Sequence, residues 1–349
     1  MQILYLNKKI KIFFYNIIFV LIFFFIIEVF LKLYFNQTKS YNCYTEVDDI
    51  RKYTNQKNCS FTEKYFEKKD STFYYTNNRG FRASKKKSGK KYNKNIYFVG
   101  DSFTFGYLSN YQDTYPYNAV KNINEVTNLQ YKEHNLGVNG YQFKQIIYLL
   151  ENNKEILDSE DLIVYGLTPN DLFDINESDD NSQIQPLGLI DKVRSVINDL
   201  NLISVKFFSS KILKNNKIYI NIYNKRGAKA GYINKEGSDI WDKKYDYFKN
   251  RIAKIPKKIR SRLVISIIPQ QIQIRLMKEN LIDNGLAFDK KILSICKSLK
   301  INCISKTLEL AKKEGYSTHF TVDGHLYPKA NKEYGKLISS EIIKILNND

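Results

Sequence analysis

Hydrophobic positions in this chain form one long run near the N-terminus and several short runs after residue 94. Residues Ile12 to Leu31 are aliphatic or aromatic, apart from Asn16 and Glu28. At a rise of ~1.5 Å per residue, a helix of this length crosses the ~30 Å hydrocarbon core of a bilayer. The run therefore predicts a transmembrane helix within residues 1–35.

Basic residues before this run predict its orientation. Lys8, Lys9 and Lys11 precede the apolar segment, and by the positive-inside rule they assign the N-terminus to the cytoplasm. A cleaved signal peptide is the alternative, but it has a shorter apolar core and a cleavage site with small residues. Here the run continues into Lys32 and Tyr34. We expect an uncleaved, single-pass anchor in a bacterial cytoplasmic membrane, with the rest of the chain on the extracytoplasmic side.

The chain after the anchor divides into two parts. Residues 36–94 are polar and rich in aromatic side chains, and they end in the basic stretch 85–91. This composition predicts an extracytoplasmic stalk or lead-in, not an independent domain. From residue 95 the pattern changes to short apolar runs that alternate with longer stretches of helical character. We therefore expect the main domain to span residues 95–349.

Strands and helices alternate along the main domain. Five apolar runs predict strands at Asn95–Val99, Leu129–Leu136, Leu162–Leu167, Leu263–Ile268 and Ile301–Ile304. Helices are predicted at Phe143–Ile156, Ala287–Leu299 and Lys329–Leu346. Such alternation favours a parallel sheet covered by helices on both faces. The interval 174–261 is too long for a single crossover, and its segments Leu187–Leu202 and Ile218–Tyr223 predict an inserted helical or mixed region.

Composition and charge add two constraints. The 349 residues are 43% hydrophobic and 14% aromatic, which excludes a disordered chain. The formal net charge of +19 is large enough to attract a polyanion or an anionic membrane. However, the lysines are dispersed, no aromatic–basic motif for nucleic acid is present, and the predicted topology is extracytoplasmic. We expect a solvated, lysine-rich surface and no nucleic-acid partner.

The four cysteines form two candidate pairs. Cys43 and Cys59 flank a short polar segment outside the predicted membrane, where a disulfide is one of two open alternatives. Cys296 and Cys303 lie on a predicted helix and the strand after it, and they fit burial as small hydrophobic residues as well as they fit pairing. No Cys/His cluster has the spacing of metal ligands. We expect neither a metal nor a cofactor.

The first segment with candidate chemistry follows the first strand of the main domain. Ile96–Val99 runs directly into Gly100–Gly106, which contains Ser102. Working loops of a parallel sheet lie at the carboxyl ends of its strands, so this serine would face a cleft. Its own N–H, at the start of a helix, is suited to stabilise a developing oxyanion. A phosphate-cradling turn and a turn with a capping serine are the alternatives, although the motifs of phosphate-binding loops are absent.

Two further loops follow the second and third strands. The second strand ends in Asn135–Gly140, where a glycine lets the backbone approach a ligand and offer an N–H. The third ends in Gly166–Asp171, where the Asn170 side chain is a candidate donor to the same oxyanion. Read separately, both segments are also ordinary turn sequences.

The last segment, Val322–Pro328, precedes the C-terminal helix and contains Asp323 and His325. A nucleophilic serine needs a neighbouring base, and an imidazole held by a carboxylate is the usual one. Of the three histidines, His134 lies on a predicted strand and is interpreted as structural, while His319 lies near the loop as a candidate rim residue. His325 has a carboxylate two residues before it, so we rank it first.

These four segments, in this order and at these strand ends, resemble the SGNH or GDSL hydrolase superfamily over about residues 95–349. The resemblance implies a flavodoxin-like three-layer α/β/α sandwich with a five-stranded parallel sheet. It also implies a nucleophile, Ser102, an activating pair, Asp323 and His325, and an oxyanion hole formed by Ser102, Gly140 and Asn170.

Two details refine the resemblance. Many members have Asp-x-x-His, whereas Asp323 and His325 form Asp-x-His, which resembles a subset that includes proteins modifying acetyl groups of exopolysaccharides. The Asn-x-x-x-x-Gly spacing of the second segment favours Gly140 over Gly137. The upstream segment Asn77–Arg82 also looks like the lead-in of bacterial membrane-anchored members.

The resemblance implies a serine esterase or O-acyltransferase that forms an acyl-serine. We expect acyl esters, above all O-acetyl groups of envelope glycans, as substrates, and an acyl-donating membrane protein as a partner of a transferase. A lipase acting on lipid esters is the enzymatic alternative. A non-catalytic glycan-binding protein of the same fold is the other alternative, although none of the catalytic residue types is missing. The choice between hydrolase and transferase stays open.

Overall fold

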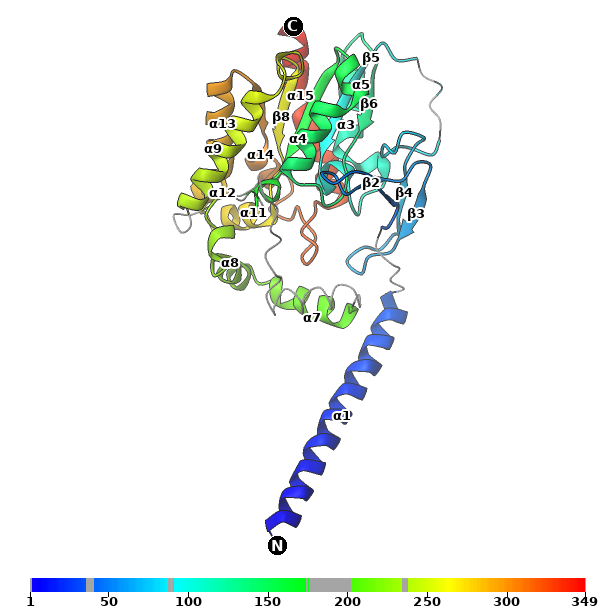
Figure 1. Ribbon diagram of the computed structural model, residues 1–349, viewed down its shortest axis with the longest axis vertical. Coiled ribbons are helices and arrows are strands. Elements are labelled where there is room, and N and C mark those ends of the chain that lie inside the picture. The colour runs from blue at the N-terminus through cyan, green and yellow to red at the C-terminus, as the bar shows by residue number, and fades with distance from the viewer. Residues whose placement is uncertain are drawn as a thin grey trace.

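The computed structural model describes residues 2–35, 41–86, 89, 91–173, 175, 202–233 and 238–348. At its centre is a parallel sheet made of β5 (Lys94–Gly100), β6 (Tyr131–Asn135), β7 (Leu162–Leu167), β8 (Leu263–Ile267) and β9 (Asn302–Ser305). The strand order is β6-β5-β7-β8-β9, and each neighbouring pair is parallel (Figure 1). The five predicted strands and the flavodoxin-like α/β fold are thus confirmed.

This strand order places a switch point beside β5. The chain passes from β5 to β6 on one side and then to β7 on the other. Connections on opposite sides of one strand diverge, and they leave a crevice beyond the carboxyl ends of the strands. The loops after β5, β6 and β7 therefore meet at one edge of the sheet.

Helices cover both faces of the sheet. One face carries α3 (Tyr115–Val126) and α15 (Pro328–Asn348), and the other carries α4 (Phe143–Asn152), α5 (Lys154–Asp158), α9 (Ser238–Lys254) and α13 (Ala287–Leu299). Neighbouring side chains of β5 pack on opposite faces of the sheet. Phe98 packs with α3 and α15, whereas Val99 packs with α4. This follows from the two-residue period of a strand.

Short helices complete the main domain. They are α2 (Ser102–Phe105), α10 (Lys257–Arg260), α11 (Gln271–Lys278), α12 (Ile282–Gly285), α14 (Thr307–Lys313) and three 3₁₀ turns at Tyr111–Asp113, Pro169–Leu172 and Gly227–Lys229. The predicted helix Phe143–Ile156 is divided into α4 and α5. The break is at Asn153, whose side chain caps α5 by accepting a hydrogen bond from the Ile156 N–H at 3.2 Å.

The described part of the predicted insertion 174–261 is helical. It contains α7 (Ile203–Leu213) and α8 (Asn216–Asn224), followed by α9 and α10. The tyrosine-rich segment Ile218–Tyr223 lies inside α8. The predicted segment Leu187–Leu202 lies outside the described residues except for its last one.

The described part of residues 36–94 forms two hairpins that pack on the main domain. Their antiparallel strands are β1 (Tyr44–Glu46) with β2 (Tyr53–Asn55), and β3 (Ser60–Glu63) with β4 (Thr72–Tyr75). The segment after β4 pairs with the end of β6, because the Arg82 N–H donates a hydrogen bond to the Asn135 carbonyl oxygen at 3.0 Å. The buried Arg82 guanidinium lies over the rings of Tyr74 and Phe105. The predicted division between a lead-in ending at residue 94 and a main domain starting at residue 95 stays a prediction. The hairpins of the lead-in contact the residues around α2.

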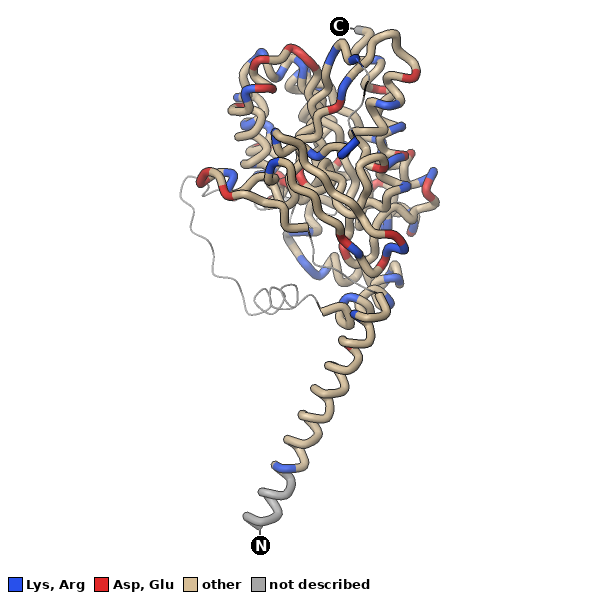
Figure 2. Tube along the Cα trace, turned by 90° about the vertical axis from the view of Figure 1, so that its right-hand side faces the viewer, with Lys and Arg blue, Asp and Glu red and all other residues tan. Residues whose placement is uncertain are grey.

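Helix α1 (Gln2–Phe35) projects from the domain (Figure 1). Its segment Ile10–Phe35 is long and apolar enough to cross a membrane, as judged from length and composition. The side chains from Ile10 to Ile26 are exposed. Figure 2 shows positive and negative positions scattered together over the domain, whereas α1 is uncharged over most of its coloured length.

Both candidate cysteine pairs are disulfides. Cys43–Cys59 links the two hairpins, and Cys296–Cys303 links α13 to β9, with Cα atoms 6.0 Å and 6.1 Å apart. These separations lie within the range that a disulfide bridges. The pairing depends on how the hairpins and the α13–β9 connection fold, which explains why sequence spacing left it open.

We predict that Gly137→Ala lowers the free energy of unfolding by about 1–3 kcal/mol, the usual cost of overpacking. A Cβ at Gly137 would overlap the Phe105 backbone nitrogen and lie 2.7 Å from Phe105 Cα. Thermal unfolding of the full chain in detergent measures the change. Gly89→Ala is the matched control, because a Cβ there meets no atom within 4 Å. Equal unfolding temperatures for the two variants would contradict the close approach of α2 to the loop after β6.

Candidate active site

Ser102 is the first residue of α2, in the tight turn that follows β5. Asp101 caps this helix, and its Oδ1 accepts a hydrogen bond from the Phe103 N–H at 2.8 Å. The helix ends at Gly106, which adopts a left-handed conformation with φ 79°. Asp101 is buried and Ser102 is half-buried. This single turn therefore presents the Ser102 hydroxyl at the carboxyl edge of the sheet.

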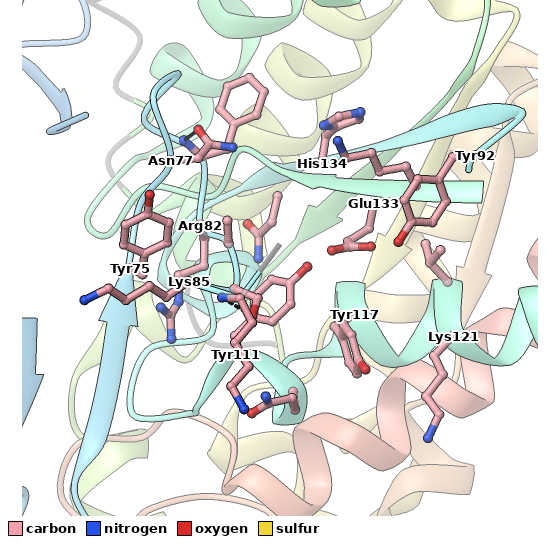
Figure 3. Close-up of a pocket in the computed structure, with 18 of the residues that line it drawn as sticks. Tyr75, Asn77, Arg82, Lys85, Tyr92, Tyr111, Tyr117, Lys121, Glu133 and His134 are labelled. Atoms are coloured by element: carbon pink, nitrogen blue, oxygen red, sulfur yellow. Dashed lines mark hydrogen bonds between the residues drawn. The ribbon is translucent and has the colours of Figure 1, made fainter. Parts of the chain in front are cut away.

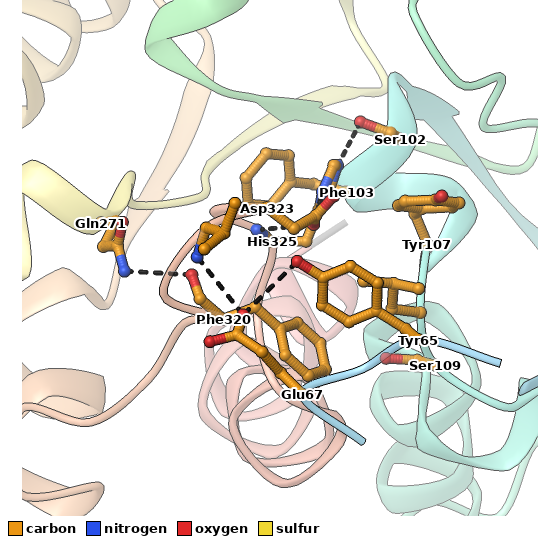
Figure 4. Close-up of polar contacts among 12 residues, drawn as sticks. Tyr65, Glu67, Ser102, Phe103, Tyr107, Ser109, Gln271, Phe320, Asp323 and His325 are labelled. Atoms are coloured by element: carbon orange, nitrogen blue, oxygen red, sulfur yellow. Dashed lines mark hydrogen bonds and ion pairs between the residues drawn. The ribbon is translucent and has the colours of Figure 1, made fainter. Parts of the chain in front are cut away.

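The fold brings Ser102 together with His325 and Asp323 (Figure 4). His325 Nε2 lies 2.6 Å from Ser102 Oγ, and His325 Nδ1 lies 2.5 Å from Asp323 Oδ1. Because a carboxylate only accepts, Nδ1 carries the proton and Nε2 is left to accept the proton of the Ser102 hydroxyl. This is the arrangement of a serine beside an oriented base.

The residue between Asp323 and His325 is Gly324, which allows a tight turn between them. Gly324 has φ 86°, a conformation that residues with a side chain rarely adopt, and its N–H donates to the Phe320 carbonyl at 3.1 Å. The turn lets Asp323 Oδ1 also accept the backbone N–H of His325 at 3.2 Å. One carboxylate oxygen thus fixes both the backbone and the ring of the histidine.

Two aromatic rings flank the imidazole. The ring centroid of Phe103 lies 4.6 Å from that of His325, and the ring centroid of Tyr107 lies 5.1 Å from it. Burial alone disfavours the charged imidazolium, but the Asp323 carboxylate opposes this effect, and the pKa of His325 is raised above its ordinary value. A base with a raised pKa has a greater affinity for the serine proton.

Asn170 lies in the 3₁₀ turn after β7 and is hydrogen-bonded to the residue before Ser102. Its Nδ2 donates to Asp101 Oδ2 at 2.8 Å. Its Oδ1 accepts hydrogen bonds from Thr168 Oγ1 at 2.6 Å and Gln270 Nε2 at 2.9 Å. Within the described part of the chain, one N–H of the Asn170 amide is left without an acceptor. The amide is therefore fixed in orientation and keeps one donor available.

The two glycines after β6 have different surroundings. The Gly137 N–H donates to Asn135 Oδ1 at 3.0 Å, whereas the Gly140 N–H donates to none of the described residues. Gly140 is exposed and has φ 79°. Tyr53 of β2 supports this loop, because its hydroxyl donates to the Asn139 carbonyl at 2.8 Å. Of the two, Gly140 is the glycine with an N–H available to a ligand.

The other two histidines already use both ring nitrogens. His319 Nε2 donates to the Pro269 carbonyl at 3.0 Å, and its Nδ1 accepts from Thr318 Oγ1 at 2.6 Å. His134 lies in β6 and its Nε2 donates to Asn95 Oδ1 at 2.9 Å, while Arg79 donates to its Nδ1. Burial lowers the pKa of each to about 3. His319 is thus a buried residue and not the rim residue expected from its position in the sequence.

Two carboxylates from the β3–β4 hairpin support the site, and no sequence motif indicated them. Glu67 Oε1 and Oε2 accept hydrogen bonds from the backbone N–H groups of Thr321 and Val322, each at 3.3 Å (Figure 4). Glu63 is buried and accepts the Tyr107 hydroxyl at 2.7 Å. Burial raises the pKa of both glutamates. Local sequence does not reveal these contacts, because Glu67 and Thr321 are 254 residues apart.

A large cavity lies away from these groups. Its volume is about 1200 Å³, and its walls come from residues 75–86, α3 and β6 (Figure 3). Glu133 lines it, and burial raises the pKa of that carboxyl group to about 7. None of Ser102, Asp323 and His325 lines this cavity. Among the described residues, no group of three His, Cys, Asp or Glu side chains is placed to hold a metal ion.

No protein-family model matches the chain, and no curated protein sequence matches it. Similar solved structures include a lipase/acylhydrolase from Enterococcus faecalis, at 12% identity and a TM-score of 0.42, covering 72% of this chain and 96% of that one. A lipolytic protein of the G-D-S-L family from Veillonella parvula has 12% identity and a TM-score of 0.38, with 73% and 99% covered. A carbohydrate acetylesterase from Sinorhizobium meliloti has 9% identity and a TM-score of 0.37, with 72% and 100% covered.

We predict that the reactivity of Ser102 falls as the pH is lowered, with a midpoint above 6.5, the ordinary pKa of histidine. The sign follows because only neutral His325 accepts the serine proton, and its raised pKa keeps it protonated to a higher pH. The labelling rate of the full chain with a fluorophosphonate probe, followed from pH 5 to pH 9, measures this. In Asp323→Asn the midpoint should move to lower pH and the rate should drop. A labelling rate independent of pH would argue against His325 as the base.

Proposed function

We propose that this protein is a serine-dependent ester hydrolase or O-acyltransferase that acts through an acyl-serine. The observation that carries the proposal is the continuous hydrogen-bonded series from Ser102 through His325 to Asp323, with distances of 2.6 Å and 2.5 Å. A hydroxyl, an imidazole of defined tautomer and a carboxylate in this order form the usual machinery for nucleophilic acyl transfer.

The first half of the reaction forms the acyl-serine. Ser102 Oγ attacks the ester carbonyl carbon while its proton moves to His325 Nε2, and Asp323 stabilises the resulting imidazolium. The carbonyl oxygen becomes an oxyanion. The donors for it are the N–H groups of Ser102 and Gly140 and the remaining N–H of Asn170. Collapse breaks the ester C–O bond, and the departing alcohol takes the proton from His325 Nε2.

The second half releases the acyl group. Water or an acceptor hydroxyl gives a proton to His325 Nε2 and attacks the acyl-serine carbonyl, again through an oxyanion. Collapse returns the proton to Ser102 Oγ. Water yields a free acid, as in an esterase, whereas a sugar hydroxyl yields a new ester, as in a transferase. The same residues serve both outcomes.

The proposed location is the extracytoplasmic side of a bacterial membrane, with α1 as the anchor. Three observations support it: the apolar segment Ile10–Phe35, the lysines before it, and two disulfides, which persist in oxidising compartments. Acyl esters of envelope glycans, acetyl esters first, are the proposed substrates at this location. If the acyl group is transferred, an acyl-donating membrane protein is the proposed partner.

We predict that Ser102→Ala lowers kcat for a chromogenic acetyl ester at least about a thousandfold, because the covalent route is lost. The full chain in detergent is assayed with and without an acetylatable glycan. Ser340→Ala, on the exposed surface of α15, is the matched control and should keep full activity. An acetylated glycan formed only by the wild type would identify a transferase. Equal rates for Ser102→Ala and wild type would refute the proposed nucleophile.

We further predict that Asn170→Ala lowers kcat about 10²–10³-fold with little change in KM, as expected for loss of one oxyanion donor. The control is Gln270→Ala, which removes a hydrogen bond to Asn170 Oδ1 but leaves the amide donor in place. Its effect on kcat should be smaller. If the two variants lose the same activity, Asn170 acts through the shape of the loop and not as a donor. Steady-state kinetics on the acetyl ester separate these outcomes.

A further inference from the structure

Glu28, a charged residue within the apolar helix α1, binds the start of α7. Its Oε1 accepts the Ile203 N–H at 2.9 Å, and its Oε2 accepts the Ser204 N–H at 2.9 Å and the Ser204 hydroxyl at 2.6 Å. Lys32 lies 3.3 Å from Glu28 Oε1. The carboxylate therefore caps α7, since the first N–H groups of a helix have no partners within it.

This cap fixes α7 at a defined level along α1. The 18 residues from Ile10 to Ile27 precede Glu28. At ~1.5 Å per residue they rise about 27 Å, close to the ~30 Å thickness of a hydrocarbon core. If α1 crosses a bilayer as proposed above, Glu28 lies at its surface. In Figure 1, α7 lies beside the upper end of α1 and is directed away from it at a steep angle.

Helix α7 is apolar on two sides. Ile203 and Phe207 pack against the domain and the end of α1. Val205, Phe208 and Ile212 lie at helical spacing on a second side, where they are 39%, 48% and 55% exposed.

Helix α8, which follows α7 in the chain, also has exposed apolar residues. Its residues Ile218 and Ile222 are also exposed, at 42% and 38%. Lys211 in α7, Lys217 in α8 and Lys214 in the connection between them are also exposed. Exposed apolar side chains beside lysines are typical of helices that lie in a membrane interface, with the lysine stems extending toward anionic headgroups.

The loop that carries Asp323 packs near the end of α1 and the start of α7. Phe320 packs with Leu31 of α1, Ile203 of α7 and Tyr65, and Val322 packs against this cluster. Asp323 follows Val322 directly. The end of α1, the start of α7 and the loop that carries Asp323 are therefore parts of one packed unit.

We propose that α7 and α8 lie in the surface of the bilayer that α1 crosses, with the side formed by Val205, Phe208 and Ile212 inserted among lipids. The occupant of this apolar surface is an anionic phospholipid leaflet. The proposal rests on the membrane anchor proposed above. This placement of α7 and α8 holds the loop that carries Asp323 at the membrane surface. The acyl ester that Ser102 attacks is therefore one presented at that surface.

Tryptophan quenching by brominated lipids tests this placement. The full chain is reconstituted in liposomes of phosphatidylcholine and phosphatidylglycerol with bromine atoms on the upper acyl chain. Single replacements Phe208→Trp, Phe24→Trp in α1 and Val126→Trp at the far end of α3 are compared with the parent, whose one tryptophan, Trp241, is buried. Quenching of the tryptophans added at positions 24 and 208, but not of that at 126, is the expected result.

The other outcomes separate the inference from the anchor. If Phe24→Trp is quenched and Phe208→Trp is not, α1 spans the bilayer and the placement of α7 is overturned. If neither is quenched, the anchor is wrong and the inference falls with it. Quenching of Val126→Trp to the same extent would mean that the domain associates with lipid without a defined face, which also overturns the proposal.

A double variant gives an independent readout. Phe208→Asp with Ile212→Asp should lower the rate on a vesicle-borne acetyl ester about tenfold relative to the rate on a soluble one, because apolar burial in lipid is lost. Ile240→Asp, which replaces a 46% exposed residue of α9, should leave this ratio unchanged. An unchanged ratio in the double variant would contradict the proposal.

Discussion

The buried carboxylate of Asp101 connects the loops on which the site depends. Its Oδ1 caps α2 by accepting a hydrogen bond from the Phe103 N–H, and its Oδ2 accepts a hydrogen bond from Asn170 Nδ2. A buried carboxylate without such donors would cost several kcal/mol, so the two loops and the carboxylate stabilise one another. The oxyanion donors proposed at Ser102 and Asn170 therefore have a fixed separation before any substrate binds, which is the condition for electrostatic preorganisation.

The hairpins before the sheet are part of this arrangement. Tyr53 supports the loop of Gly140, Glu67 holds the backbone before Asp323, and Glu63 holds the Tyr107 ring against His325. The candidate site residues lie in loops and short helices beyond the strands and before α15, and contacts from the hairpins hold these segments. The disulfide Cys43–Cys59 in turn constrains the hairpins. The fixed positions of the site residues thus depend on residues that are far from them in the sequence.

Much of the sheet was predictable because its strands are short apolar runs with distinct ends. Leu162–Leu167 and Ala287–Leu299 have the predicted bounds, and the placement of Ser102 and Asn170 just after strands follows from parallel topology. His325 lies in the loop between α14 and α15, where the sequence motif and not a strand end indicated it. The contribution of Glu63 and Glu67 was not predictable, since a glutamate in a polar segment gives no local signal of burial. The break at Asn153 was missed because a capping asparagine within an apolar pattern does not disturb its periodicity.

The packing of α1 near the loop that carries Asp323 has a practical consequence. A chain shortened to begin after α1 would lose the Glu28 cap of α7 and would remove Leu31 from the apolar cluster that also contains Phe320 and Tyr65. Newly exposed apolar surface of this kind promotes self-association. The end of α1 is thus part of the apolar packing of the domain, and a fragment without α1 would lack contacts that the full chain has.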